Sequence, residues 1–325
     1  MTTQHPSAAT TPATPPTSDD TPIVEFSDAS VSRGGHTIWS HGNFSIPKGT
    51  VTAIVGTNGA GKTTLLTIEL GLLPLSHGHV RVLGKPAGSI NDRIGYVPQS
   101  YASDIDSNIT AEQSVGLGLT GARFGFHRQS AQDKQKISDA LGMAGIADKA
   151  SLRLSEMSGG MRQRVAIAQA LVADPDLLLL DEPLANLDLA GQRGLVDVLS
   201  QLNSTFGMSI QVVAHDINML LPILTGAVYL LDGHPHYSPI ANVMDSKLLT
   251  HLYGTKVEVI KTPQGDMFVR PDQEEEPAGR RQHLHTPKEA ASFHAEPKGA
   301  AERSASAAGA TENPESPESS GRQAH

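Results

Sequence analysis

A short apolar strand followed at once by a glycine-rich turn constrains this chain more than any other feature. Residues Val51–Val55 are small or β-branched and predict a buried strand. Residues 56–63 then read Gly-Thr-Asn-Gly-Ala-Gly-Lys-Thr, which matches the phosphate-loop pattern G-x-x-x-x-G-K-[ST]. A helix is predicted from Thr63 to Leu70, so its N-terminus would lie beneath bound phosphates. This order of strand, glycine loop and helix predicts an α/β fold that binds a nucleoside triphosphate.

The phosphate loop supplies most of the predicted nucleotide contacts. Its glycines let the backbone turn tightly and direct several N–H groups at phosphate oxygens. Lys62 would neutralise the β and γ phosphates, and Thr63 would ligate Mg²⁺. The pattern by itself accepts ATP or GTP. The predicted contacts in this loop are Gly56, Thr57, Asn58, Gly59, Ala60, Gly61, Lys62, Thr63 and Thr64.

A pair of carboxylates follows a second apolar run. Residues Leu177–Leu180 are all leucine, which predicts a strand buried on both faces, as in a parallel sheet. Asp181 and Glu182 come next, at the end of the strand where α/β folds bind ligands. Asp181 would hold Mg²⁺, and Glu182 would act as the general base for the attacking water. Alone, this pattern also fits a strand that enters an acidic turn; the upstream phosphate loop favours ATP hydrolysis.

Composition limits the other classes of function. The net charge of −9 and the absence of a basic face argue against nucleic acid as a partner. No cysteine is present, so disulfides and thiolate metal sites are excluded. No Lys or Arg precedes Arg33 and no apolar stretch lies near the N-terminus, so we expect no secretory signal. The apolar stretch 219–231 is interrupted by Pro222 and is shorter than the roughly 20 residues of a membrane span.

Composition also divides the chain. Residues 1–21 are rich in Thr, Pro, Ser and Ala and predict a disordered leader. Residues 22–270 predict one nucleotide-binding domain, and residues 271–325, rich in Pro, Ala, Ser and Glu, predict a disordered tail. A helical region is expected at about 100–165, with capping-box patterns at 110–113 and 130–133.

A serine-glycine-glycine turn before a helix identifies the family. Residues 154–161, Leu-Ser-Glu-Met-Ser-Gly-Gly-Met, resemble the signature motif of ABC ATPases, although Met157 and Met161 replace the usual leucine and glutamine. In isolation, the turn also fits an ordinary helix start. The resemblance implies that Ser158, Gly159 and Gly160 close over the γ-phosphate bound by a second copy of the chain, while Met161 leaves these contacts in place.

Further motifs follow in the order of this family. Gln99 ends a stretch that resembles the glutamine loop, which reaches Mg²⁺ and the attacking water. Asp188 lies in a stretch that resembles the loop crossing the dimer interface. His215 matches the switch histidine that contacts the γ-phosphate. As lone residues these are ordinary loop groups, but their order agrees with the family. The resemblance implies Lys62, Gln99, Glu182 and His215 as catalytic residues and Thr63, Gln99 and Asp181 as Mg²⁺ contacts.

The adenine contact departs from the family pattern. Arg33 stands where an aromatic residue is common. Its planar guanidinium could stack on adenine, and His36 is a second candidate. Arg33 equally fits a solvated turn residue.

The resemblance implies a P-loop ABC nucleotide-binding domain with an antiparallel β subdomain and an inserted helical subdomain. It implies ATP and Mg²⁺ as cofactors. Its expected partners are a second copy, membrane permease subunits and, through them, an extracellular solute-binding protein, at the cytoplasmic face of the membrane.

Looser stretches at 116–121, 130–145 and 248–254 resemble ATPase subunits of zinc and manganese importers. A transporter of another solute is an alternative. A non-transport ABC ATPase fits less well, because this chain has a single cassette and no sustained heptads. A cassette that only binds nucleotide is disfavoured by the intact catalytic set.

Overall fold

The computed structural model describes residues 21–99, 108–120, 130–262 and 267–271. The chain divides into two units, Met1–Gln273 and Glu274–His325, and all described residues belong to the first. Apart from Thr21 and Pro271, the predicted leader and tail lie outside the described residues.

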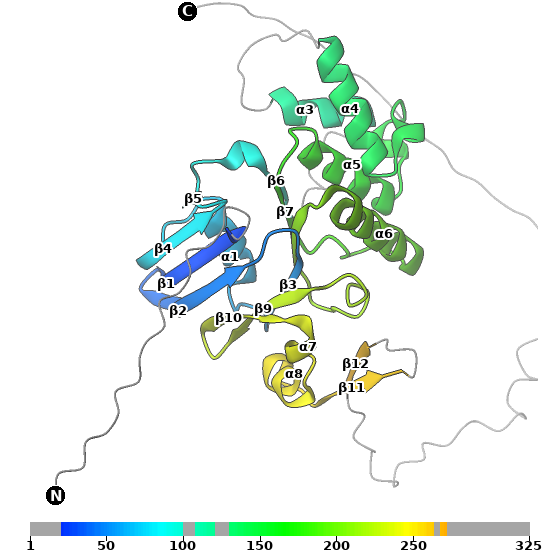
Figure 1. Ribbon diagram of the computed structural model, residues 1–325. Coiled ribbons are helices and arrows are strands. Elements are labelled where there is room, and N and C mark those ends of the chain that lie inside the picture. The colour runs from blue at the N-terminus through cyan, green and yellow to red at the C-terminus, as the bar shows by residue number, and fades with distance from the viewer. Residues whose placement is uncertain (1–20, 100–107, 121–129, 263–266, 272–325) are drawn as a thin grey trace, which may run out of the picture. The chain divides into compact units, whose positions relative to one another are not determined.

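A six-stranded sheet forms the centre of the described unit (Figure 1). Its order is β10-β9-β3-β8-β7-β6, and every neighbouring pair is parallel except β9 and β10. The strands β3, β7 and β8 are buried along their whole length, as the apolar runs of β3 and β7 predict, while β8 also buries Ser209 and Gln211. The strands are β3 (Val51–Val55), β6 (Ile94–Val97), β7 (Leu177–Asp181), β8 (Ser209–Val213), β9 (Gly226–Leu231) and β10 (His234–Pro239).

A second, antiparallel sheet has the strand order β2-β1-β4-β5. Its strands β1 and β2 precede the phosphate loop in the sequence, and β4 and β5 follow it. Gly34 and Gly35, both in the left-handed region, form the tight turn between its first two strands. The helix α1 (Lys62–Glu69) joins the two sheets, because its Leu65 and Leu66 share one buried cluster with Trp39 and Ile54. The strands are β1 (Val24–Arg33), β2 (His36–Ile46), β4 (His77–Val82) and β5 (Lys85–Pro86).

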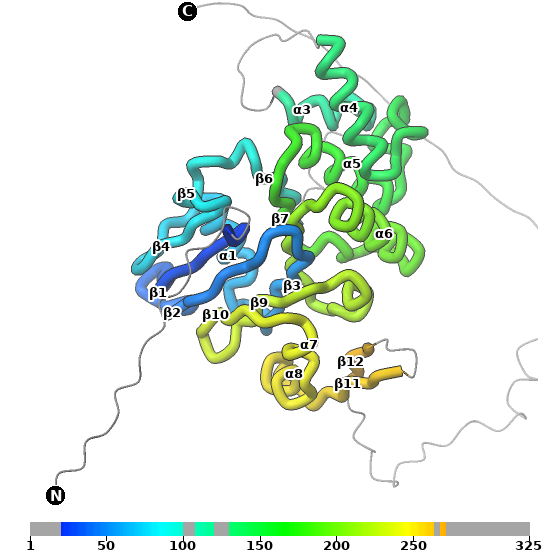
Figure 2. The backbone as a smooth tube through the Cα atoms, in the orientation of Figure 1, coloured from blue at the N-terminus to red at the C-terminus, as the bar shows by residue number. Residues whose placement is uncertain are grey.

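A helical region is inserted between β6 and β7, and Figure 2 lets the chain be followed out of the sheet and back. Both predicted capping boxes are present: Thr110 and Gln113 exchange two hydrogen bonds, and so do Ser130 and Asp133. Gly95 lets α5 approach β6 closely, since an added Cβ would lie 2.8 Å from the carbonyl oxygen of Ala170. The helices are α3 (Ala111–Thr120), α4 (Ala131–Met143) and α5 (Gly159–Leu171), with 3₁₀ turns at Asn91–Arg93, Ala147–Lys149 and Leu154–Glu156.

The C-terminal part of the unit adds α6 (Leu189–Phe206), α7 (Ile240–Val243) and α8 (Ser246–Tyr253). A hairpin of β11 (Val257–Lys261) and β12 (Met267–Pro271) follows (Figure 1). No helix within the described ranges is long and apolar enough to cross a membrane. The parallel sheet, antiparallel sheet and inserted helices confirm the predicted fold class.

Candidate nucleotide-binding and hydrolysis site

The phosphate loop has a backbone that only glycine can adopt at its last turn. Gly59 and Gly61 have φ angles of 81° and 95°. An added Cβ at Gly61 would lie 2.6 Å from Cγ2 of Ile38 and 2.9 Å from Cδ1 of Trp39. Gly61 is also the N-cap of α1, and no side chain caps this helix. The N–H groups of the first helical turn therefore have no side-chain cap to compete with an anionic ligand.

Lys62 lies over this loop rather than in solvent. Its Nζ donates hydrogen bonds to the carbonyl oxygens of Gly56, at 3.0 Å, and Thr57, at 3.1 Å, and the residue is 7% exposed. Burial lowers the pKa of Lys62, while the nearby carboxylates of Glu182 and Asp181 raise it. The structure thus places a cation beside the loop, close enough to the two predicted acidic residues for their charges to act on it.

Asp181 ends β7 and is 4% exposed. Burial raises the pKa of its carboxyl, and a hydrogen bond from the Thr63 side chain lowers it. Its Oδ1 is buried without a hydrogen-bond partner among the described residues. A hydroxyl next to a carboxylate with an unused buried oxygen suits Mg²⁺, which prefers oxygen ligands. Thr63 and Asp181, two of the three residues predicted for Mg²⁺, therefore fit the ion, whereas the Gln99 amide is bonded to Glu182.

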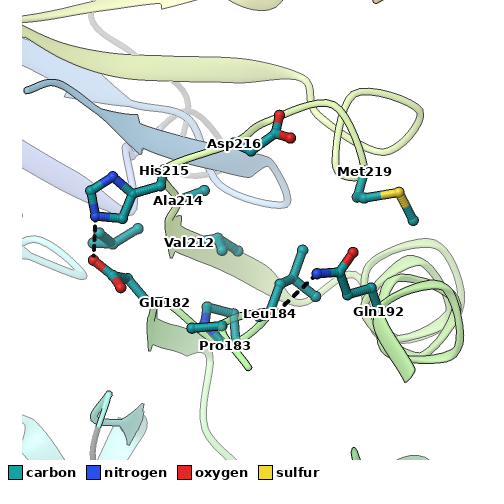
Figure 3. A pocket seen from close by; sticks show the side chains of 11 residues that line it. Glu182, Pro183, Leu184, Gln192, Val212, Ala214, His215, Asp216 and Met219 are labelled. Atoms are coloured by element: carbon teal, nitrogen blue, oxygen red, sulfur yellow. Dashed lines mark hydrogen bonds and ion pairs between the residues drawn. The ribbon is translucent and has the colours of Figure 1, made fainter. Parts of the chain in front are cut away.

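The Glu182 side chain contacts two other predicted site residues, and Figure 3 shows its pairing with His215. Its Oε1 lies 3.0 Å from Nε2 of His215, and its Oε2 accepts a hydrogen bond of 2.8 Å from Nε2 of Gln99. The backbone of Glu182 has φ of 50°, an unusual conformation for a residue with a side chain. Three of the four predicted catalytic residues, Gln99, Glu182 and His215, thus come together because β6, β7 and β8 are parallel neighbours that end at the same edge.

The signature residues lie elsewhere. Ser158 caps α5 by accepting a hydrogen bond from the N–H of Met161, and Asp188 caps α6 in the same way from Gly191. Both line a pocket of about 530 Å³ together with Gly159 and Gly160. This pocket contains no residue of the phosphate loop. The predicted nucleotide contacts of one chain therefore form two separate groups.

The two adenine candidates lie at the tip of the β1–β2 hairpin. Arg33 and His36 face each other in the strand register, on either side of the glycine turn, and both are exposed. Ile38 and Trp39, shortly after the tip, surround Gly61. This hairpin therefore leads directly to the phosphate loop.

Sequence reasoning missed two buried groups next to the site. Trp39 is fully buried beside Gly61, and its Nε1 has no hydrogen-bond partner among the described residues. Glu69 of α1 is also fully buried and accepts a hydrogen bond of 3.0 Å from Gln211 of β8. Burial raises the pKa of Glu69 well above its usual value, and the bond from Gln211 lowers it. The position of Glu69 four residues after Leu65, on the apolar face of the helix, was the signal that could have revealed it.

Site and fold together define a P-loop ATPase, and comparisons with known proteins specify its family. The sequence profile described as "ABC transporter" matches residues 40–185. The zinc transport system ATP-binding protein of Treponema pallidum is 34% identical over 221 residues, which are 68% of this chain and 83% of that protein. The manganese transport system ATP-binding protein of Bacillus subtilis is 31% identical over 238 residues, 73% of this chain and 95% of that protein.

Solved structures agree with these relatives. An ABC transporter assigned to the metal-chelate type, in an inward-facing conformation, is 25% identical with a TM-score of 0.68, over 77% of this chain and 98% of that chain. A dimeric ATP-binding cassette in a post-hydrolysis state, bound to ADP and phosphate, is 27% identical with a TM-score of 0.57, over 67% of this chain and 99% of that chain.

The chain belongs to the ABC transporter family, as its signature motif predicts. The cassettes of this family are ATPases that bind ATP, dimerise and work with membrane permease subunits. The expectation of an ATPase rather than a binding-only cassette is confirmed.

Proposed function

We propose that this chain hydrolyses ATP, with Mg²⁺, to drive import of a divalent transition metal, zinc or manganese, through a separate membrane permease. The observation that carries the hydrolytic part is the Glu182 carboxylate, held between His215 and Gln99 beside Lys62 and Asp181. The metal part rests on the relatives named for zinc and manganese transport, and on the resemblance of segments 116–121, 130–145 and 248–254.

The phosphate loop binds the nucleotide in this proposal. Backbone N–H groups of residues 56–64 donate hydrogen bonds to the phosphate oxygens, and Lys62 exchanges its bonds to Gly56 and Thr57 for bonds to phosphate oxygens. Thr63 and Asp181 would hold Mg²⁺, with Gln99 in reach, and the ion would supply positive charge that offsets the phosphates. Arg33, or His36 in its place, would stack on adenine.

Glu182 takes the proton of the attacking water. Its carboxylate is held from two sides, which fixes its orientation before the reaction. When ATP is bound, His215 can turn its Nε2 toward the γ-phosphate and Gln99 can turn toward the magnesium site, so both report the nucleotide state.

A second copy completes the site. Ser158, Gly159 and Gly160 at the N-terminus of α5 suit a phosphate, and Asp188 borders the same pocket. ATP would therefore lie between the phosphate loop of one copy and the signature of the other. The complex would sit at the cytoplasmic face of the membrane, and the permease would receive metal at the opposite face from an extracellular solute-binding protein.

Deletion of the gene tests the transport role. We expect lower cellular zinc or manganese, measured by elemental analysis, and slow growth under chelation that added metal restores. The parental gene should complement the deletion, whereas Lys62→Ala should not, because its product lacks the phosphate-binding cation. Unchanged metal content beside a defect for another solute would contradict the metal assignment and leave the ATPase assignment intact.

A further inference from the structure

The backbone of the loop that carries His215 is tied to the sheet at its start, where the N–H of Ala214 donates a hydrogen bond of 3.3 Å to the carbonyl oxygen of Ile54 in β3. Regular pairing of β8 ends at Val213, and the switch loop, defined here as residues 214–219, contains no regular secondary structure. His215 is exposed within it, and Figure 3 shows its side chain reaching toward Glu182 while Asp216 points away. The direction of the His215 side chain therefore depends on what holds this loop.

Asn218 connects the switch loop to the C-terminal hairpin. Its Oδ1 accepts a hydrogen bond of 2.7 Å from the N–H of Val269, and its Nδ2 donates one of 2.9 Å to the carbonyl oxygen of the same residue. One side-chain amide thus pairs with both backbone groups of Val269, as a neighbouring strand would. The N–H of Asn218 also donates to Oδ1 of Asp216, at 2.9 Å, which fixes the turn directly after His215.

The hairpin itself is anchored on its other edge. Val259 of β11 lies opposite Val269 in the register, and its N–H donates to Oγ of Ser246 in α8. Both valines also pack against the main hydrophobic core. Burial and the nearby Asp216 carboxylate raise the pKa of Tyr253, in α8, to about 12. The switch loop is therefore linked to the hairpin through Asn218 and lies near α8 through Asp216, and the hairpin is itself tied to α8 and to the core.

We propose that Asn218 is a positioning residue for His215, and that the β11–β12 hairpin holds the switch loop where His215 can reach Glu182 and the γ-phosphate. Asn218 contacts no reacting group; it acts through the loop. This inference rests on the role proposed above for His215 in ATP hydrolysis.

The contact can be removed from either side in the full-length chain. Asn218→Ala deletes the amide. Val269→Pro deletes the N–H that faces Asn218 and leaves the ladder of the hairpin intact, because this N–H does not point at β11. Either variant should lower kcat for ATP hydrolysis by about 10-fold to 100-fold, because a displaced catalytic group slows the reaction. The affinity for ADP should stay unchanged, because it depends on the remote phosphate loop. The double variant should lose no more turnover than the more impaired of the two single variants, because both substitutions remove the same contact.

Asn203→Ala is the matched control. Asn203 also donates hydrogen bonds to two backbone carbonyls, Gly49 and Met208, but it lies at the end of α6, outside the switch loop. It should lower the melting temperature and retain kcat. This control separates loss of positioning from loss of stability, and thermal unfolding of every variant identifies those that fail to fold.

His215→Ala separates this inference from the proposed function. If His215→Ala abolishes turnover while Asn218→Ala and Val269→Pro both keep the parental kcat, the positioning role is wrong and the role of His215 stands. If His215→Ala itself keeps the parental kcat, the proposed role of His215 is wrong and the inference fails with it. Equal, non-additive losses in kcat at constant ADP affinity support the inference.

Discussion

The phosphate-loop half of the cassette and the signature half are built in different ways. In the first half, the charged groups are buried and paired within the chain: Lys62 is 7% exposed, Asp181 is 4% exposed, and Thr63 bonds to Asp181. In the second half, Ser158 and Asp188 are exposed N-caps of their own helices beside an open pocket of about 530 Å³.

In the proposed function, this difference is the reason that two copies are needed to complete a site. A buried lysine is tolerated only with compensating partners, so the first half carries its own carboxylates. The second half offers a helix N-terminus, but its predicted contacts include no paired cation. Such a surface is stabilised most when another molecule brings a phosphate to it. The sequence places both halves in one chain, whereas the geometry separates them.

The largest change in turnover should come from mixing two inactive variants, one altered in each half of the cassette. Lys62→Ala damages the first half and Ser158→Arg the second, so each homodimer should show only background turnover. In a mixed dimer, one composite site carries both changes and the other carries neither, so turnover should return. ATPase assays of separate and mixed proteins check this, and Ser158→Arg alone should still bind ATP. Absence of turnover in verified mixed dimers would argue against sites shared between copies.

Glu182→Gln should separate ATP binding from ATP hydrolysis within the first half. The amide keeps the size of the side chain but cannot accept the proton, so turnover should fall by a factor between about 10² and 10⁴. ATP binding should persist, and ATP-bound dimers should accumulate in size-exclusion chromatography. Near-parental turnover would remove Glu182 from the role of general base.

Met161→Gln should have a small effect on the second half. The backbone N–H of Met161 bonds to Ser158, while its side chain packs against the core, so the phosphate contacts do not depend on it. Turnover should change by less than about threefold, equivalent to under 1 kcal/mol. Strong activation would instead show that methionine weakens the native signature.

Glu69→Gln should leave turnover unchanged and alter only the pH dependence of stability. Burial raises the pKa of Glu69 above the usual 4.5 in the folded state, so between these two pKa values the folded chain binds more protons than the unfolded chain. The contribution of Glu69 to stability is therefore complete below about pH 4.5 and declines as the pH rises. The variant lacks this loss, so its advantage in urea unfolding should grow from pH 5 to pH 8. Parallel curves for the two proteins would contradict the raised pKa.

The sequence by itself determined the family and the fold class, and it predicted the chemistry of each half. Local patterns are sufficient where the interactions are local. Gly61 adopts a left-handed backbone that glycine favours, and the run of leucines in β7 predicts burial. The capping boxes at Thr110 and Ser130 depend only on residues three positions along the chain. The strands β3 and β7 followed from the same patterns.

Only the tertiary structure decided which distant residues meet. Gln99, Glu182 and His215 are brought together by the parallel order of their strands, and Asn218 meets Val269 because a C-terminal hairpin folds back onto the switch loop. Glu69 and Gln211 form their buried pair because α1 packs on β8. Such contacts depend on strand order and packing between elements far apart in sequence, and no local pattern of residue types encodes them.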